Sequence, residues 1–297
     1  MPKEQYYIDM MQADWRETTK EIKIPILEKR IAISTACRDA DSLPRVDNAG
    51  ECLVDSSGHA VQIMHNGLKV LYGRYYGSWV NEIIKGLGGV HEPQEEVVFH
   101  EVIKRLPKGS TMIEAGCYWG YYSMWFKHAV EEAKVFLVEP HSNQMRVAQN
   151  NFELNGLDGD FTNGYFGTYP EKKLQIQLKR AQSELPRFTI KEFMELKGLD
   201  HVTLLHSDIQ GHEEEMLETS QTVLEQRKID YLFISTHGQR HDACREILTK
   251  HGYRIIVEHS IGESASADGL LVVQNPELPE LAAIEISRVE GLVQAHS

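Results

Sequence analysis

A regular alternation of short apolar runs and amphipathic segments begins near residue 93 and continues almost to the end of the chain. The apolar runs have the length of buried strands, and the segments between them carry apolar residues at helical spacing. The strand candidates are residues 111–115, 134–139, 160–166, 201–209 and 229–236. Strands that alternate with helices predict an α/β fold, with a parallel sheet and helices on both of its faces.

The last two strand candidates break this alternation. Residues 253–260 and 269–275 follow one another with no helix between them. Parallel neighbours need a long crossover, so this pair predicts an antiparallel closing ladder. An ordinary dinucleotide-binding sheet would keep alternating strand and helix, and the ending therefore distinguishes this chain from that fold.

The first 90 residues are organised differently. Residues 4–21 fit an amphipathic helix, and the polar residues 38–60 predict a loop. Asn66-Gly67 lies between two apolar runs and predicts a hairpin, because both turn positions favour positive φ. We therefore predict three parts, which are an N-terminal accessory subdomain or lid over residues 1–90, a main domain over residues 91–276, and a C-terminal tail over residues 277–297.

Charge, hydropathy and cysteine usage limit the partners and the compartment. The formal net charge of −13 argues against a nucleic-acid substrate, because an acidic protein repels phosphate. The sequence contains no apolar run of about 18 residues, so no membrane span is predicted. The first residues lack the pattern of a secretory signal, so none is expected. The four cysteines are scattered without a CxxC pair, so reduced thiols and a cytoplasmic location are expected.

A turn with two glycines four positions apart follows the first strand candidate. Gly116 and Gly120 let the backbone turn tightly and approach a ligand closely. Bulky residues, Tyr118 among them, stand where a pyrophosphate turn needs glycine. Glu114 before the turn disfavours a phosphate and suits a cation such as the ammonium of a methionine moiety. The alternative is that the glycines only permit close packing of helix against strand.

The second strand candidate ends in an acid, Glu139. A carboxylate at this position can accept hydrogen bonds from both hydroxyls of a ribose. Acids at two successive strand ends describe a ligand made of a nucleoside and an amino-acid tail, without a phosphate. Close packing would explain the glycines but not this pair of acids.

Four stretches of the sequence resemble the FkbM family of class I methyltransferases. They are HEPQEE at 91–96, MIEAGCYWGYYS at 112–123, VEPHSNQMRVAQNNFELNG at 138–156 and HSDIQGHEEEML at 206–217, and the resemblance covers roughly residues 60–275. Glu114 replaces the usual Asp, Cys117-Tyr118 replaces Ala-Asn, and Gln210 replaces an acid. The resemblance implies a Rossmann-like class I methyltransferase fold, with a seven-stranded, mostly parallel sheet whose final strand is antiparallel.

The same resemblance implies a donor and a set of residues that hold it. The donor is S-adenosylmethionine, and the reaction is O-methylation of a hydroxyl on a sugar or secondary metabolite. The implied contacts are Glu114, Gly116 and Gly120 at the methionine end, Glu139 at the ribose, and Asn163 and Gly164 near the adenine. Glu92 is a further candidate because it precedes the first strand at about the family's distance. Tyr118 is also a candidate for cofactor contact, because an aromatic ring can contact a sulfonium.

Two residues after the fourth and fifth strands are candidates for catalysis. An alcohol has a high pKa, so a general base or a metal ion assists its methylation. Asp208 and His237 follow strands that are adjacent if the sheet is parallel, and they would then lie at the same rim. Either residue is predicted to accept the hydroxyl proton. A divalent metal held by Asp208 with His237 or His241 is the alternative, although no ligand spacing such as HExxH occurs.

The sequence thus predicts an S-adenosylmethionine-dependent O-methyltransferase that acts on a small polar molecule, without a nucleic-acid or membrane partner. A non-catalytic protein that binds the donor is an alternative. An NAD-dependent oxidoreductase is another, and Tyr118 counts against it. N-methylation is disfavoured because no Asn-Pro-Pro-Tyr element occurs at 208–211. Residues 277–294 are mildly amphipathic and predict either packing on the domain or a homodimer contact.

Overall fold

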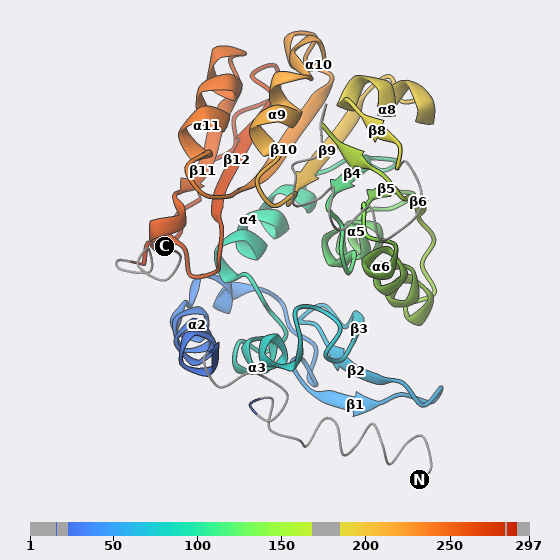
Figure 1. Ribbon diagram of the computed structural model, residues 1–297, viewed down its shortest axis with the longest axis vertical. Coiled ribbons are helices and arrows are strands. Elements are labelled where there is room, and N and C mark those ends of the chain that lie inside the picture. The colour runs from blue at the N-terminus through green and yellow to red at the C-terminus, as the bar shows by residue number, and fades with distance from the viewer. Residues whose placement is uncertain (1–15, 17–22, 168–184, 283, 290–297) are drawn as a thin grey trace.

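The computed structural model describes residues 16, 23–167, 185–282 and 284–289. A large sheet flanked by helices forms the upper part of the molecule in Figure 1, and a small antiparallel sheet with two helices lies below it. The helix predicted over residues 4–21 lies outside the described residues, apart from Arg16. No helix in the described ranges is both long and apolar enough to cross a membrane.

The large sheet has seven strands in the order β11-β12-β10-β9-β4-β5-β6. Their bounds are β4 (Thr111–Ala115), β5 (Lys134–Val138), β6 (Asp160–Thr162), β9 (Val202–Ser207), β10 (Ile229–Thr236), β11 (Arg254–His259) and β12 (Gly269–Gln274). The last strand, β12, is inserted between β10 and β11 and runs antiparallel to both. The remaining ladders, from β10 to β6, are parallel. The predicted fold class, a mostly parallel sheet with an antiparallel final strand, is confirmed.

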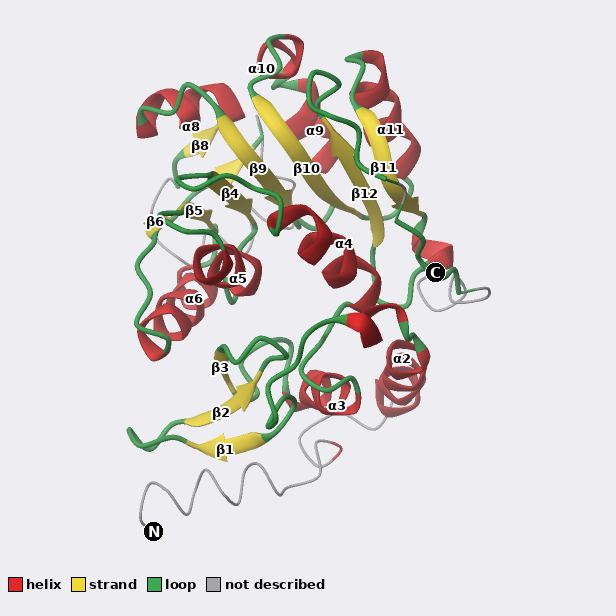
Figure 2. Ribbon diagram, turned by 180° about the vertical axis from the view of Figure 1, so that it is seen from behind, coloured by secondary structure: helices red, strands yellow, loops and turns green. Residues whose placement is uncertain are grey.

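Helices cover both faces of this sheet (Figure 2). One face carries α4 (Pro93–Ile103), α5 (Tyr121–Ala129) and α6 (Ser142–Leu154), and the other carries α8 (Ile190–Lys197), α9 (Glu213–Glu218), α10 (Gln221–Glu225) and α11 (His241–Lys250). Each face has its own apolar core, to which alternate residues of the strands contribute. The strands therefore read as continuous apolar runs, because a parallel sheet is buried on both sides.

Helix starts and breaks were predictable only where a local signal exists. The capping box at Thr189 and Glu192 begins α8, as the residue spacing predicts. Ser142 has a side chain typical of an N-cap, but it is the first helical residue of α6, and His141 takes the N-cap position without a side-chain bond. The segment between β9 and β10 forms two short helices, α9 and α10.

The N-terminal part is built on a three-stranded antiparallel sheet. It contains β1 (Cys52–Val54), β2 (Ala60–Ile63) and β3 (Lys69–Leu71), with α2 (Ile24–Ala36), the 3-10 turn η3 (Asp39–Ser42) and α3 (Ser78–Gly86). The hairpin predicted around Asn66-Gly67 is confirmed as β2-β3. The loop predicted over residues 38–60 is wrong in part, because η3 and β1 form within it. β1 is only half-buried and is surrounded by polar residues, so its three residues carry no clear strand pattern.

Side chains of α6 hold the edge of this small sheet. Asn155 Oδ1 accepts from the Lys69 amide and its Nδ2 donates to the Lys69 carbonyl, both at 2.8 Å. Asn151 Oδ1 accepts from the Leu71 amide at 2.9 Å. Together they satisfy backbone groups that β3 would otherwise leave unpaired at a sheet edge. Apolar residues of the small sheet and α3 also share one core with α4, α5 and α6. The division at residue 90 and the motion of a lid stay predictions.

A buried polar network at the start of α4 joins the two parts of the molecule. The Glu96 side chain is fully buried and accepts from the His91 amide at 2.7 Å, from His91 Nδ1 at 2.6 Å and from the Tyr121 hydroxyl at 3.2 Å. His65, from the turn after β2, lies 3.6 Å from the second oxygen of Glu96. A buried carboxylate is tolerated only when paired in this way.

The C-terminal tail packs along the domain in its described part. Gln94 of α4 donates to the Ser287 carbonyl at 2.7 Å, and Asp39 of η3 accepts from the Ser287 amide at 2.8 Å. Leu278, Leu281 and Ile284 pack against the core of the α4 face. The tail therefore uses its apolar side within the chain, the first of the two predicted alternatives.

Candidate active site

The carboxyl ends of β4, β5, β9 and β10 form one rim of the sheet, and the predicted site residues follow these strands. Gly116 after β4 has a φ of +76°, and a Cβ there would lie 1.9 Å from the carbonyl oxygen of Asp208. The absence of a side chain thus lets the turns after β4 and β9 touch. Gly120 has a φ of +71°, and its missing Cβ would meet Ala148 and Phe152 of α6 at 3.1 Å. Gly120 therefore serves helix packing, whereas Gly116 shapes the rim.

Glu139 lies directly after β5 and is the best-defined group at this end of the rim. Its carboxylate accepts from the His141 amide at 2.8 Å and from the Tyr118 amide at 3.2 Å, and the residue is 3% exposed. Burial raises the pKa of Glu139 to about 7, against the lowering effect of the two amides. Asn163 and Gly164 both donate to the Glu139 carbonyl, at 2.6 and 3.3 Å. The structure thus brings Tyr118, Glu139, Asn163 and Gly164 together.

Two other predicted residues lie on the α4 side. Glu114 is buried and accepts from the Ser123 amide of α5 at 3.1 Å, and burial raises its pKa. Glu92 is the N-cap residue of α4, and its Oε2 lies 3.0 Å from both His91 Nε2 and the Tyr122 hydroxyl. Burial alone would raise the pKa of Glu92, but the pairing with His91 outweighs it and lowers that pKa. The charge of Glu92 also contributes to a raised pKa at Asp208.

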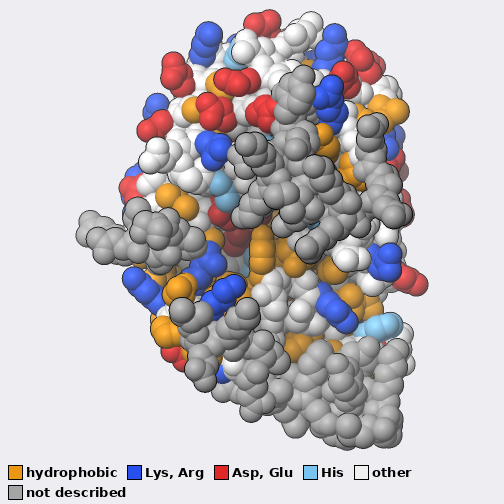
Figure 3. Space-filling view, in the orientation of Figure 1, with side chains coloured by type: hydrophobic (Ala, Val, Ile, Leu, Met, Phe, Trp, Pro, Cys, Tyr) orange, Lys and Arg blue, Asp and Glu red, His pale blue; other side chains and the backbone are white. Residues whose placement is uncertain are grey.

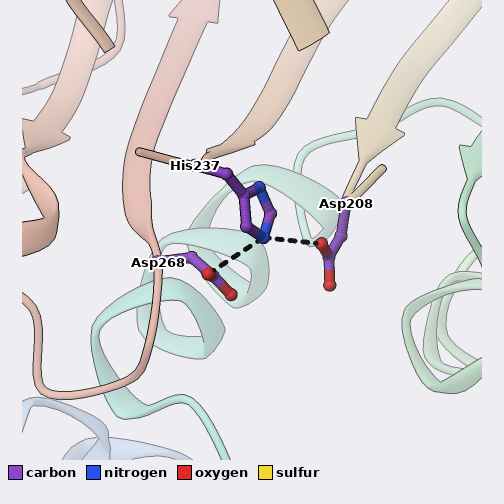
Figure 4. Close-up of side chains that lie close together, drawn as sticks. All are labelled: Asp208, His237 and Asp268. Atoms are coloured by element: carbon purple, nitrogen blue, oxygen red, sulfur yellow. Dashed lines mark ion pairs between the residues drawn. The ribbon is translucent and has the colours of Figure 1, made fainter. Parts of the chain in front are cut away.

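Asp208 and His237 meet at the rim, as the adjacency of β9 and β10 predicts, and a third residue joins them (Figure 4). His237 Nε2 lies 3.5 Å from Asp208 Oδ1 and 2.9 Å from Asp268 Oδ1. The other ring nitrogen, Nδ1, is 2.8 Å from Oε1 of the fully buried Glu213. Sequence reasoning missed Asp268 and Glu213. Asp268 directly precedes β12, and an antiparallel strand begins at the rim where its parallel neighbours end.

The three acids set the protonation of this cluster. Burial alone would lower the pKa of His237, but hydrogen bonds to Asp268 and Glu213 raise it to about 11. Burial, followed by the charge of Asp268, raises the pKa of Asp208 to about 8. His237 is therefore cationic at neutral pH with only protons present, and it has no lone pair to accept another proton. Asp208 has the pKa of a base that works near neutrality.

Other histidines near the ends of β9 and β10 lie outside this cluster. His206 is buried and pairs with Glu95 at 2.8 Å. His212 Nδ1 lies 3.6 Å from Glu215. His241 Nδ1 lies 2.9 Å from the Thr236 hydroxyl, and its Nε2 is 3.7 Å from Glu258. His241 therefore has partners of its own and does not face Asp208 in a shared ligand set.

A cavity of about 660 Å³ lies between the small sheet and α6, next to this rim. Its lining includes Arg74, Tyr76, Tyr118, Asn143 and Arg146. Tyr76 belongs to this lining, and desolvation of its hydroxyl, followed by the charges of Asp208 and Asp268, raises its pKa. In Figure 3 basic side chains gather over α2 and α3 and a few lie near α6 and the small sheet, whereas acidic and basic ones are interspersed over the helices above.

Comparison with known proteins identifies one family. Residues 106–255 match the model described as the methyltransferase FkbM domain. No curated protein matches the sequence significantly.

Several solved structures are similar at low identity. TrmK of M. capricolum in complex with S-adenosyl-homocysteine is 15% identical, with 62% of this chain and 71% of that chain covered and a TM-score of 0.41. The ribosomal protein L11 methylase of Lactobacillus delbrueckii subsp. bulgaricus is 14% identical, with 63% and 81% covered and a TM-score of 0.39. Precorrin-6y C5,15-methyltransferase of Geobacter metallireducens is 15% identical, with 61% and 88% covered and a TM-score of 0.38.

Proposed function

The chain belongs to the FkbM methyltransferase domain family, whose members use S-adenosylmethionine, and from this premise we propose that it methylates a hydroxyl of a sugar or other small polar metabolite. The observation that carries the proposal is the rim itself. One end has a carboxylate directly after β5, and the other has the acid–histidine cluster after β9 and β10. A donor with a ribose would suit the first end, and an acceptor whose hydroxyl must lose a proton would suit the second.

The residues at the β5 end fit the nucleoside part of S-adenosylmethionine. Glu139 has backbone amides on its carboxylate and is held by them at the strand end, as a ribose-binding acid requires. Gly116 lets the turn after β4 lie directly against the turn after β9, which fixes the shape of the rim beside the proposed donor site. When bound, S-adenosylmethionine supplies an activated methyl group, whose C–S bond breaks as the O–C bond forms, with loss of the hydroxyl proton and release of S-adenosylhomocysteine.

The chain's own task is to orient the acceptor and to take its proton. Alignment at near-attack distance is the main requirement when the donor is already activated. Asp208 is the proposed proton acceptor, and His237, held by Glu213, keeps it in place. The polar cavity beside Tyr76 would admit the acceptor. Arg74 and Arg146 line this cavity and favour an acceptor with an anionic or strongly polar group.

Calorimetric titration of the full chain with S-adenosylhomocysteine is the first test. We expect micromolar binding at one site per chain, with no heat from NADH at the same concentration, because the turn after β4 lacks the glycines that a pyrophosphate needs. Binding of NADH alone would favour an oxidoreductase. Binding of S-adenosylhomocysteine without turnover of any hydroxylated acceptor, nucleic acids included, would favour a non-catalytic binding protein.

The ribose contact of Glu139 gives a second prediction. Glu139→Ala should weaken S-adenosylhomocysteine binding by about tenfold or more, since hydrogen bonds to a charged acceptor are strong. Glu153→Ala, on an exposed position of α6, is the matched control and should bind like the wild type. The measurement is again calorimetry, after circular dichroism has shown that both variants are folded. Equal affinities of the two variants would remove Glu139 from the cofactor site.

A further inference from the structure

Asp208, His237 and Asp268 present three ligand atoms to one small volume at the rim (Figure 4). His237 Nε2 lies 2.9 Å from Asp268 Oδ1 and 3.5 Å from Asp208 Oδ1, and the three atoms all lie within 4.8 Å of one another. Neighbouring ligands of an octahedral ion with bonds of about 2.1 Å are about 3.0 Å apart. The observed spacing therefore needs only a small contraction to surround an ion.

The orientation of His237 is the one that metal-binding histidines have. Its Nδ1 contacts Glu213 Oε1 at 2.8 Å, which turns Nε2 toward the two aspartates. A histidine that binds a metal almost always donates its other ring N–H to a carboxylate or carbonyl. Glu213 is fully buried, and its Oε2 has no hydrogen-bond partner among the described residues. Such a buried, half-satisfied carboxylate needs positive charge on the ring that it faces.

Gln210 and the two aspartates cannot all be satisfied around His237 unless Asp208 carries a proton. Gln210 Nε2 lies 2.9 Å from His237 Nε2 and 2.7 Å from Asp208 Oδ1. If His237 Nε2 carries a hydrogen, two donors face each other, namely this N–H and the Gln210 amide N–H. If His237 Nε2 carries a lone pair, two acceptors face each other, namely this nitrogen and the Asp268 oxygen. Turning the amide over moves the conflict to Asp208, because two acceptors then face each other. A cation that binds the Nε2 lone pair and the aspartate oxygens removes the conflict.

We propose that Asp208, His237 and Asp268 bind a divalent cation and that Glu213 positions the imidazole. One imidazole with two carboxylates suits an ion such as Mn²⁺ or Zn²⁺, with water in the remaining positions. The role of the ion rests on the proposed function: it would hold the hydroxyl oxygen of the acceptor and lower its pKa, so that the oxygen of Asp208 that does not bind the ion can take the proton. Binding of the ion itself does not depend on that function.

The test titrates Mn²⁺ into the full chain after treatment with a chelator, with free Mn²⁺ followed by electron paramagnetic resonance. The wild type should bind one ion per chain with a micromolar Kd. Asp268→Asn should weaken binding at least tenfold, and Glu213→Gln should do so by about 10- to 100-fold. Asp230→Asn is the matched control, because Asp230 Oδ2 lies 2.9 Å from His201 Nε2, away from the proposed site. This variant should bind Mn²⁺ like the wild type.

Three outcomes would overturn the proposal: no binding of Mn²⁺ or of Zn²⁺ by the wild type, equal binding by the wild type and Asp268→Asn, or equal losses in Asp268→Asn and Asp230→Asn. Asp208→Asn repeats the test if Asp268→Asn does not fold, as judged by circular dichroism. Calorimetry with S-adenosylhomocysteine in the presence of chelator separates this proposal from the proposed function. If the chain binds S-adenosylhomocysteine but no ion, the metal site is rejected and the proposed function is not. If the chain binds the ion but not S-adenosylhomocysteine, the proposed function is rejected and the metal site is not.

Discussion

Gly116→Ala is expected to destabilise the protein by about 2–5 kcal/mol and to abolish S-adenosylhomocysteine binding. Gly116 has a φ of +76°, which L residues rarely adopt, so a side chain there is strained whatever space surrounds it. The added Cβ would also lie 1.9 Å from the Asp208 carbonyl oxygen. Because that oxygen belongs to the backbone, it cannot turn aside as a side chain could. The turns after β4 and β9 would have to separate, which would distort the rim where the donor is proposed to bind.

The measurement is denaturant unfolding of the variant together with calorimetry. Gly156→Ala is the matched control, since Gly156 has a φ of +63° and a Cβ there would meet no atom within 4 Å. It isolates the backbone strain, which costs about 1–2 kcal/mol. If the two variants lose the same free energy of unfolding, the collision with Asp208 is relieved at no cost and the argument for Gly116 is wrong.

Features that depend on local pattern were predictable from the sequence. β4 and β10 have the bounds that their apolar runs predict, because a buried parallel strand must be apolar on both faces. The meeting of Asp208 and His237 also follows from local information. Each residue comes directly after a strand, and neighbouring parallel strands in a sheet end at the same rim.

Asp268 and Glu213 could not be predicted in the same way, because their positions depend on long-range pairing. Asp268 stands in a polar stretch that is typical of a turn, and it reaches the rim only because β12 enters the sheet between β10 and β11. Glu213 begins a run of three glutamates at the start of α9, where acids commonly face solvent and stabilise the helix dipole. Only the packing of α9 against β10 distinguishes the buried glutamate from the other two.

Glu96→Ala is expected to lower the free energy of unfolding by about 3–5 kcal/mol, because it removes one partner of a buried ion pair. Glu96 is fully buried and accepts from the backbone and ring of His91 and from the Tyr121 hydroxyl. With alanine in its place, these donors would lose their acceptor and would remain away from water, and His65 Nε2 would lose the carboxylate that lies 3.6 Å from it. The network joins α4 to the N-terminal part, so the loss is expected to affect the whole fold rather than one loop.

Denaturant unfolding as a function of pH distinguishes this network from an ordinary surface pair. Burial alone would lower the pKa of His91, but Glu92 and Glu96 outweigh it and raise the pKa to about 10, above the ordinary 6.5. The protonated imidazole therefore stabilises the fold fully below pH 6.5, and this contribution is lost as the pH rises toward 10. Glu96→Ala should make that decline shallower.

Glu101→Ala is the matched control. Glu101 is also on α4, but in a partly exposed pair with Lys104 and Arg105, so its loss should cost about 1 kcal/mol or less and leave the decline unchanged. A decline of the same slope in Glu96→Ala and the wild type would show that Glu96 does not hold the charge on His91.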